Sequence, residues 1–504
     1  MRKLIVCCDG TWNEPEEDGK RSKDRSDTNV VTLSNAIAIR DCHDNAQLVH
    51  YQKGVGTTVV WRLAGGALGV GISEDIRQCY EFLCREYLNE DDQIFLFGFS
   101  RGAYAARSLG GLIVQCGLLK IVPEESNSNF KRRAEDAYDS YKKGQDAVQE
   151  FRESEETHDN VSIEFLGVWD TVGALGIPDH LFLNKLDRRE HFQFHDTRLS
   201  QNVKTARHAV AIDEMRESYT PTLWVDAHNH PDAKEVWFAG VHSNIGGGYA
   251  DESLGNITLN WMMNQAADNG LVFKSDFTPP EEDPSGMLHD SADSKFWRKL
   301  GLRPRGIPRI SDEKKVHASV RKRQSDVNLS PRYRIERQLV AGTTAVTVES
   351  VERWNNTGFY LEKGQVYEFK AEGTWRDASR MTDADGFKHG GIAHWTAQAI
   401  EGAMGLLRKK RGFHEVRLPF TRRVPDYNWF SLVGVIANEN VVPGEQSARQ
   451  HETFLIGNGT VYTAKDSGYL YCFANDTWQT YERNNNGSID LTVTHRGKNM
   501  RPTY

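Results

Sequence analysis

The stretch from Gln93 to Arg107 constrains the fold of this chain more than any other. It begins as a short apolar run, passes through Gly98-Phe-Ser-Arg-Gly102, and continues into Ala-rich sequence that favours helix. A serine on such a sharp strand-to-helix turn projects its hydroxyl outward. Glycines two residues to either side remove the Cβ atoms that would collide in the bend. The pattern therefore predicts a nucleophile elbow at Ser100.

Apolar runs that end in a polar residue recur through the first half of the chain and alternate with helical patterns. Such alternation predicts an α/β fold with a mainly parallel sheet and helices on both faces. A glycine-rich loop is expected at 65–72, either as close packing beside the active-site face or as a mobile contact for an acyl chain. The expected strands are 4–8, 46–51, 93–99, 161–169, 206–213 and 235–242, and the expected helices are 29–39, 73–88, 100–119 and 126–156.

The second half of the chain has a different character. Beyond residue 340 the helical signal nearly vanishes, and short alternating stretches are separated by Gly, Asn and Asp turns, for example at 345–351, 365–371 and 488–494. This pattern predicts an all-β sandwich. Since 504 residues are too many for one ordinary core, we expect a catalytic domain at 1–335 and a sandwich domain at 336–504. Residues 393–407 would form a helix or an inserted loop.

The composition argues against some classes of protein. The net charge of -8 and the pI near 6.1 argue against a nucleic-acid binder, which would usually carry a basic excess. Seven cysteines without a regular framework indicate a reduced chain with free thiols. We find no signal-peptide pattern and no apolar run of the ~18 residues that a membrane span needs. Residence in the cytoplasm is the default expectation, and export by a machine that reads no N-terminal signal stays open.

Three polar residues at predicted strand ends match a catalytic triad. Ser100, Asp170 and His242 occur in the order Ser, Asp, His that α/β-type hydrolases use. A serine hydroxyl needs a base to take its proton, and the base works best when an acid orients it. We expect Ser100 to be the nucleophile, His242 the base and Asp170 the acid. The alternative base is His317, and the alternative acid is Asp213.

Backbone N–H groups are expected to stabilise the oxyanion of this reaction. Arg101 would begin the helix after the serine, where amide donors lack intrahelical partners. A second donor is expected in the loop after the first strand, at Gly10 or Thr11. Asp9 would take part in this site or would only shape the turn. The first half shows no metal-ligand pattern, and the expected chemistry requires no cofactor.

Several motifs occur in order within residues 1–335: Val6 to Asn13, Thr28 to Val30, Gly98 to Tyr104, Gly167 to Gly173, Ala211 to Glu214 and Trp237 to Tyr249. Together they resemble the DUF2235 α/β-hydrolase family, the catalytic domain of type VI secretion phospholipase effectors of the Tle1 type. The resemblance implies an α/β-hydrolase fold and a triad at Ser100, Asp170 and His242. By analogy with the effectors it implies a phospholipid substrate. One departure is Asn244, where many relatives carry aspartate.

Residues 453–488 show a second resemblance. Thr453 to Gly457, Ser467 to Tyr471 and the stretch from Asn475 to Ser488 are similar to the PA-IL-like galactose-binding lectins, which hold sugar through calcium. The residues that match the calcium loop of that family are Asp476, Thr480, Asn484 and Asn485, and oxygen ligands of these types suit calcium. The spacing before the Asn pair is one residue longer than in the lectins, so a turn that lost its ligand is the alternative.

The preferred hypothesis is a serine esterase that acts on lipid acyl esters, a phospholipase of the type VI effector kind. Its expected partners are the lipid substrate, the secretion machinery or an immunity protein, and carbohydrate through the second domain. The basic run from Lys314 to Arg337 and the cluster from Arg408 to Arg411 would contact anionic headgroups or form a solvated surface.

Two alternatives stay open. One is an esterase for glycan-linked or small soluble acyl esters, in which the lectin-like domain selects the carbohydrate. The other is a carbohydrate- or surface-binding protein whose hydrolase domain is vestigial. An intact Ser-Asp-His set argues against the second alternative.

Overall fold

The computed structural model of the chain describes residues 1–10, 26–54, 68–173, 199–292, 301–339, 344–388, 421–438 and 451–497. The chain forms two compact units, each described by itself. The first consists mainly of Met1–Ser291 and Glu313–Asp326, and the second mainly of Ala292–Asp312, Val327–Val442 and Ser447–Tyr504. The domain boundary at residue 335 stays a prediction.

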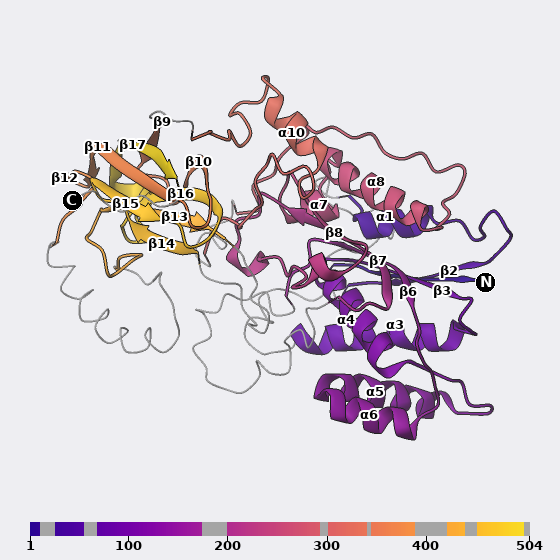
Figure 1. The fold of residues 1–504 in the computed structure, drawn as a ribbon. Coiled ribbons are helices and arrows are strands. Elements are labelled where there is room, and N and C mark those ends of the chain that lie inside the picture. Colours follow the sequence, from indigo (N-terminus) through magenta and orange to yellow (C-terminus); the bar gives the residue numbers. More distant parts are fainter. Residues whose placement is uncertain are drawn as a thin grey trace. The chain divides into compact units, whose positions relative to one another are not determined.

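A six-stranded parallel sheet forms the centre of the first unit, with strand order β2-β1-β3-β6-β7-β8 (Figure 1). The sequence prediction of a mainly parallel sheet is confirmed. The central position of β3 places the residue that follows it in the middle of the carboxyl edge of the sheet. The strands are β1 (Lys3–Cys8), β2 (Gln47–Gln52), β3 (Gln93–Phe99), β6 (Ile163–Trp169), β7 (Val203–Ala211) and β8 (Ala233–Phe238).

Helices cover both faces of this sheet, as predicted. Side chains alternate along a strand, so β1 contributes Leu4 and Val6 to one apolar core and Ile5 and Cys7 to the other. One face carries α3 (Leu68–Glu86), α4 (Arg101–Cys116), α5 (Asn127–Lys143) and α6 (Gln145–Ser154), and the other carries α1 (Asn29–Ala36), α7 (His242–Gly246) and α8 (Ser253–Asp268) (Figure 1). Further elements of the unit are β4 (Leu118–Leu119), β5 (Thr157–His158), the 3-10 turns η2 (Glu217–Tyr219) and η3 (Ala227–Asn229), and α10 (Ala318–Ser325).

Several predicted elements differ from the structure at their ends, and the helix predicted at 126–156 is two helices, α5 and α6. The loop predicted at 65–72 is helical from Leu68 onward, where α3 begins, while 65–67 lie outside the described residues. Burial of Ile72 on α3 in the core outweighs the low helix propensity of glycine. The strand predicted to reach His242 ends at Phe238, because Gly240 has φ 135° and turns the chain before α7.

The second unit is a sandwich of two antiparallel sheets, which confirms the predicted all-β fold. One sheet has the order β10-β16-β13-β14 and the other β12-β11-β17-β9, with β15 paired to β11. Both sheets contribute to one apolar core, for example Leu470 from the first and Phe369 from the second. The segment 393–407 lies outside the described residues. The strands are β9 (Thr344–Glu349), β10 (Asn355–Leu361), β11 (Val366–Asp377), β12 (Arg380–Thr382), β13 (Leu432–Ala437), β14 (Glu452–Leu455), β15 (Gly459–Thr463), β16 (Gly468–Ala474) and β17 (Asn485–Gly497), with a short helix α12 (Tyr481–Asn484).

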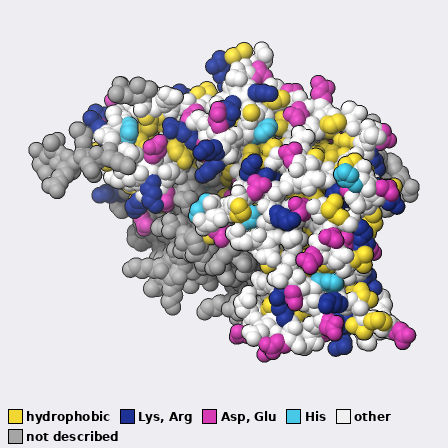
Figure 2. Space-filling view, turned by 45° about the vertical axis from the view of Figure 1, so that its right-hand side comes forward, with side chains coloured by type: hydrophobic (Ala, Val, Ile, Leu, Met, Phe, Trp, Pro, Cys, Tyr) yellow, Lys and Arg dark blue, Asp and Glu magenta, His cyan; other side chains and the backbone are white. Residues whose placement is uncertain are grey.

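The cysteines, the surface charges and the apolar character of the helices bear on the class of protein. All seven cysteines are free, and only Cys42 is exposed. Acidic and basic side chains are interspersed over the described residues on the face shown in Figure 2. Among the helices of the described ranges, we find none with the length and apolar character to cross a bilayer.

Candidate active site

Ser100 lies on a strained turn between β3 and α4. Its φ of 59° and ψ of -120° are values that a residue with a side chain rarely adopts. The turn closes only because its flanking residues lack side chains. A Cβ on Gly98 would lie 2.4 Å from the Gly102 carbonyl oxygen, and one on Gly102 would lie 2.1 Å from that of Cys8. The geometry is that of a nucleophile elbow.

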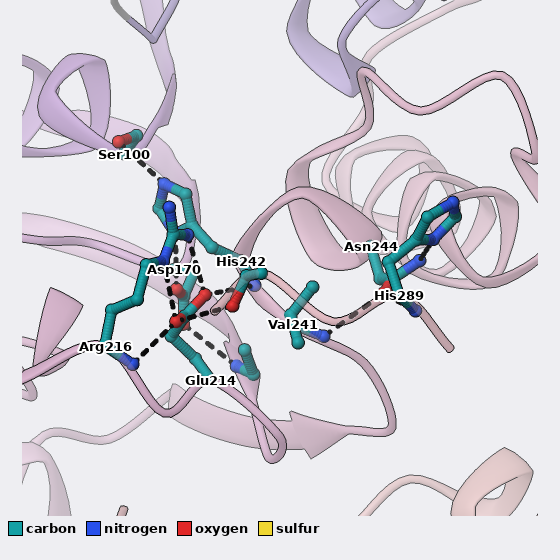
Figure 3. Close-up of polar contacts among 10 residues, drawn as sticks. Ser100, Asp170, Glu214, Arg216, Val241, His242, Asn244 and His289 are labelled. Carbon is teal, nitrogen blue, oxygen red and sulfur yellow. Dashed lines mark hydrogen bonds and ion pairs between the residues drawn. The ribbon is translucent and has the colours of Figure 1, made fainter. Parts of the chain in front are cut away.

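His242 lies within hydrogen-bonding distance of this serine. The Ser100 hydroxyl donates to His242 Nε2 at 2.8 Å, and His242 Nδ1 donates to Asp170 Oδ2 at 2.6 Å (Figure 3). A carboxylate only accepts, so Nδ1 carries the imidazole hydrogen and Nε2 is free to take the serine proton. The structure thus brings together the three residues that the sequence predicts as a triad.

Asp170 follows directly after β6 and is completely buried. Its Oδ1 accepts a hydrogen bond from the Ala211 backbone N–H at 2.9 Å, and its Oδ2 faces His242. Each oxygen of the carboxylate therefore has a fixed partner, and the side chain cannot turn without breaking both bonds.

The alternative residues do not take these places. His317 is the N-cap of α10, and its Nδ1 interacts with Ser319. Asp213 accepts from the Gly240 backbone N–H at 2.8 Å and so holds the turn before α7. The place of the base beside Ser100 is taken by His242, and the place of the acid beside His242 Nδ1 is taken by Asp170.

The surroundings of His242 favour its neutral form. Burial lowers the pKa of His242 below its ordinary value, while the hydrogen bond and charge of Asp170 act in the opposite direction. Phe99 packs on one side of the ring, with centroids 4.6 Å apart, and Tyr219 meets it edge-on at 4.9 Å. A neutral, firmly packed imidazole near pH 7 is what a general base requires.

The structure places the three predicted oxyanion donors, Arg101, Gly10 and Thr11, in different situations. Arg101 is the first residue of α4, directly after Ser100. The Gly10 N–H donates to Asp9 Oδ1 at 2.6 Å, so in this conformation it points at that carboxylate. Thr11 lies outside the described residues. The oxyanion roles of these residues stay predictions.

Asp9 does more than shape a turn. Its Oδ2 accepts from the Tyr51 hydroxyl at 2.7 Å and from the Thr28 hydroxyl at 2.9 Å. Burial raises the pKa of Asp9 to about 6, against the effect of these hydrogen bonds. Thr28 is also the N-cap of α1. Asp9 therefore ties the loop after β1 to β2 and α1, beside the elbow.

Sequence reasoning missed two residues that lie beside the triad, Glu214 and Arg216. Glu214 Oε2 accepts from the His242 backbone N–H at 3.2 Å, and Arg216 forms an ion pair with Glu214 at 2.8 Å (Figure 3). The one signal in the sequence is the position of Glu214 in the Ala211 to Glu214 motif, directly after a predicted strand end. A bond to a backbone N–H leaves no trace in the sequence of the residue that donates it.

Asn244 holds the same loop from the other side. Its Oδ1 accepts from the Val241 backbone N–H at 3.3 Å, and its Nδ2 lies 3.0 Å from His289 Nδ1 (Figure 3). Asn244 thus braces the loop that carries His242.

A polar cluster in the second unit contains the predicted calcium residues. The Thr480 hydroxyl donates to Asp476 Oδ2 at 2.9 Å, and Asn484 Nδ2 donates to Asp377 Oδ1 at 2.5 Å. The Oδ1 atoms of Asn484 and Asn485 are buried without a hydrogen-bond partner.

The donor set of this cluster fits a calcium ion. Burial and the charge of Asp377 raise the pKa of Asp476 to about 6. Two unpaired amide oxygens, a hydroxyl and two carboxylates are the kinds of ligand that calcium takes. Sequence reasoning missed Asp377. Within the described ranges, no cluster of three or more His, Cys, Asp and Glu side chains suited to a metal occurs.

Comparison with known proteins identifies the family of the chain. A family model described as the catalytic domain of Tle1-like phospholipase effectors of the type VI secretion system matches residues 2–265. The chain belongs to this Tle1-like family. An uncharacterized protein of Saccharomyces cerevisiae is 28% identical over 239 residues, which are 43% of this chain and 32% of the yeast protein.

Solved structures with some likeness to the chain include a Tle1-family effector. The Tle1 effector bound to the VgrG spike of the type 6 secretion system is 18% identical, with a TM-score of 0.29, and the match covers 49% of this chain and 51% of the effector. The N-terminal domain of EclA, a PllA-like lectin, is 17% identical, with a TM-score of 0.19, and the match covers 30% of this chain and 95% of that domain. The chain thus spans about a third of the yeast relative and about half of the effector.

Proposed function

We propose that this chain is a serine hydrolase that cleaves acyl esters of lipids, a phospholipase of the type VI effector kind. The observation that carries the proposal is the hydrogen-bonded row from Ser100 through His242 to Asp170, set on a strained turn. Membership of the Tle1-like family supports lipid as the substrate class.

In the proposed reaction, Ser100 Oγ attacks the ester carbonyl carbon while its proton passes to His242 Nε2. Asp170 accepts the Nδ1 hydrogen bond throughout and stabilises the imidazolium that forms. Backbone N–H groups near Arg101 and in the loop after β1 would bind the oxyanion. The imidazolium then protonates the leaving alcohol, which leaves an acyl enzyme on Ser100.

Water completes the cycle. His242 takes a proton from the attacking water, the C–O bond to Ser100 breaks, and the fatty acid departs as the serine regains its proton. All proton transfers run through one imidazole, so apart from the substrate and water the proposed reaction uses only groups of the chain.

The test is the release of fatty acid from phosphatidylethanolamine and phosphatidylglycerol vesicles, compared with hydrolysis of a short soluble nitrophenyl ester. We expect vesicle hydrolysis that Ser100→Ala abolishes. The matched control is Ser108→Ala, which should retain activity. Ser108 is a buried serine on α4, the helix that begins directly after Ser100. Soluble-ester hydrolysis without vesicle hydrolysis would favour the small-ester alternative, and no Ser100-dependent hydrolysis of either substrate would favour the vestigial one.

For the second unit we propose a calcium-dependent carbohydrate site. Asp476, Thr480, Asn484 and Asn485 would hold the ion, which would supply coordination to sugar hydroxyls. The orphaned amide oxygens of the two asparagines support this assignment. The site would direct the hydrolase to a glycan-bearing surface and would also serve the glycan-ester alternative.

Calcium binding is testable through stability. Ligand that binds only the folded state raises the melting temperature, so millimolar calcium should stabilise the wild type and chelation should reverse the effect. Asp476→Asn should remove the response, and the exposed Asp490→Asn on β17 should keep it. An equal response in Asp476→Asn would contradict the assignment. Galactose-type sugars should then bind only in the presence of calcium.

We further propose that a protein of the secretion machinery or an immunity protein is a partner, and the type VI secretion system in the description of the family supports the first. Contact of the basic run 314–337 with anionic lipid is a weaker proposal. In the first unit, Arg323 of this run is buried and donates to the Pro284 and Gly286 carbonyl oxygens, and Arg321 pairs with Glu313 at 3.4 Å. These guanidinium groups already have protein partners, which reduces the charge available to a membrane.

A further inference from the structure

Glu214 makes contacts on every side of its carboxylate. Oε1 accepts from the Arg216 backbone N–H at 2.9 Å, from Arg216 Nε at 2.8 Å and from the Ser291 hydroxyl at 2.8 Å. Oε2 accepts from the His242 backbone N–H at 3.2 Å and pairs with the Arg216 guanidinium. A carboxylate that is 1% exposed and carries this many bonds is fixed in place. It therefore fixes the start of α7, where His242 lies.

Arg216 reaches the same histidine by a second route. Its guanidinium carbon lies 3.5 Å from the centroid of the Tyr219 ring, and Tyr219 meets the His242 ring edge-on at 4.9 Å. In Figure 3 the Arg216 side chain extends alongside Glu214 and Asp170, on the side of His242 away from Asn244. The ion pair thus contacts the histidine through its backbone and through the aromatic residue that packs on its ring.

We propose that Glu214 and Arg216 form a positioning pair for His242, which holds the imidazole against Ser100 and Asp170 and balances a negative and a positive charge beside it. The proposal rests on the proposed hydrolase function, because it assigns a supporting role at the same base. It makes neither residue catalytic, since neither contacts the reacting hydroxyl.

The charges of the pair act on His242 in opposite senses. Arg216 lowers the pKa of His242 and Glu214 raises it, and both effects are smaller than those of burial and of Asp170. Tyr219 and Tyr249 are further titratable groups that interact with Arg216, and Asp290 in turn interacts with Tyr249. With both members present the two effects oppose each other, whereas removal of either charge leaves the other unopposed.

The experiment follows the titration of His242 by NMR of histidine-labelled protein, with the resonance identified by its absence in His242→Asn. Glu214→Gln keeps an acceptor for the His242 N–H and removes the negative charge, so its titration should move to lower pH. Arg216→Gln keeps a donor and removes the positive charge, so its titration should move to higher pH. We expect shifts of about half a pH unit or more in these opposite directions. The double variant should return close to the wild type.

Controls separate the pair's role from general damage. Arg216→Lys keeps the charge and should leave the titration near that of the wild type. Arg133 on α5 is a similarly buried cation, and it pairs with Glu155 at 2.7 Å. Arg133→Gln should therefore leave the titration of His242 unchanged. Shifts in the same direction for both members of the pair, or no shift in either, would overturn the proposal.

Hydrolysis supplies a second, independent readout. The acid limb of the pH dependence of kcat/KM should follow the NMR shift of each variant, since that limb reports the base of the free enzyme. Absence of ester hydrolysis in the wild type would contradict the proposed function and would leave the NMR result intact as the test of the pair.

Discussion

Replacement of Asp170 with asparagine should leave the fold in place but move the imidazole hydrogen of His242 from Nδ1 to Nε2. The reason lies in the two fixed partners of the carboxylate. Oδ1 accepts from the Ala211 backbone N–H at 2.9 Å, so the carbonyl oxygen of an asparagine must occupy that position. The amide NH2 group must then face His242 Nδ1, which lies 2.6 Å from Oδ2 in the wild type. A donor at that position forces Nδ1 to act as an acceptor.

An imidazole that accepts at Nδ1 carries its hydrogen on Nε2. Nε2 is the atom that faces the Ser100 hydroxyl at 2.8 Å, and in this tautomer it cannot take the serine proton. Loss of the correct tautomer in a serine triad costs about 10⁴-fold in kcat, which corresponds to about 5.5 kcal/mol of transition-state stabilisation. The loss should appear in kcat far more than in KM, because Asp170 is buried behind His242 and does not face the substrate.

The assay is steady-state ester hydrolysis by Asp170→Asn beside Asp213→Asn. Asp213 is the matched control, because an asparagine there can still accept from the Gly240 N–H, and its loss should be less than about tenfold. Equal melting temperatures would show that both variants are folded. A loss below about tenfold in Asp170→Asn, or an equal loss in the two variants, would refute the tautomer argument and return Asp213 to consideration as the acid.

Two further predictions concern the residues around the elbow. Gly102→Ala should lower the free energy of unfolding by about 3 kcal/mol and abolish serine reactivity, because its Cβ would lie 2.1 Å from the Cys8 carbonyl oxygen. Gly110→Ala on the same helix, whose nearest neighbour is at 3.4 Å, should be neutral or stabilising in thermal unfolding. The pKa of Asp9 rises from 3.8 in the unfolded chain to about 6 in the fold. The native state therefore binds the proton more tightly, so the stability of the wild type falls as the pH rises from 3.8 to about 6 and stays lower above that. In urea unfolding, the stability of Asp9→Asn relative to the wild type should grow by up to about 3 kcal/mol between pH 4 and pH 7, and a pH-independent difference would contradict this reasoning.

The mainly parallel sheet and the gathering of Ser100, Asp170 and His242 at its carboxyl edge could be predicted because they follow from rules that act locally. Strands in a parallel sheet all point the same way, so polar residues that follow them gather at one edge. Ser100 and Asp170 each come directly after a strand, and His242 follows a turn after β8. The glycines at positions 98 and 102 indicate the tight bend by their spacing alone, and the close contacts that a Cβ would make at each position give the physical reason.

Features that depend on contacts between residues far apart in the sequence could not be predicted. The bond from the His242 backbone N–H to the Glu214 carboxylate joins residues 28 positions apart and is set by the path of the chain after two strands. The start of α3 at Leu68 was missed for a related reason, since burial of its later turns outweighs a glycine-rich beginning. Asp377 lies on β11, nearly a hundred residues from Asp476, and only sheet pairing brings it to Asn485.

The most direct test of the central claim is covalent labelling of the wild type with a fluorophosphonate, which captures an activated serine, followed by mass mapping of the adduct. We predict a single phosphonyl adduct, located on Ser100, at a rate that Asp170→Asn and His242→Asn reduce strongly. Absence of an adduct on Ser100, or equal labelling of Ser100→Ala, would contradict the account.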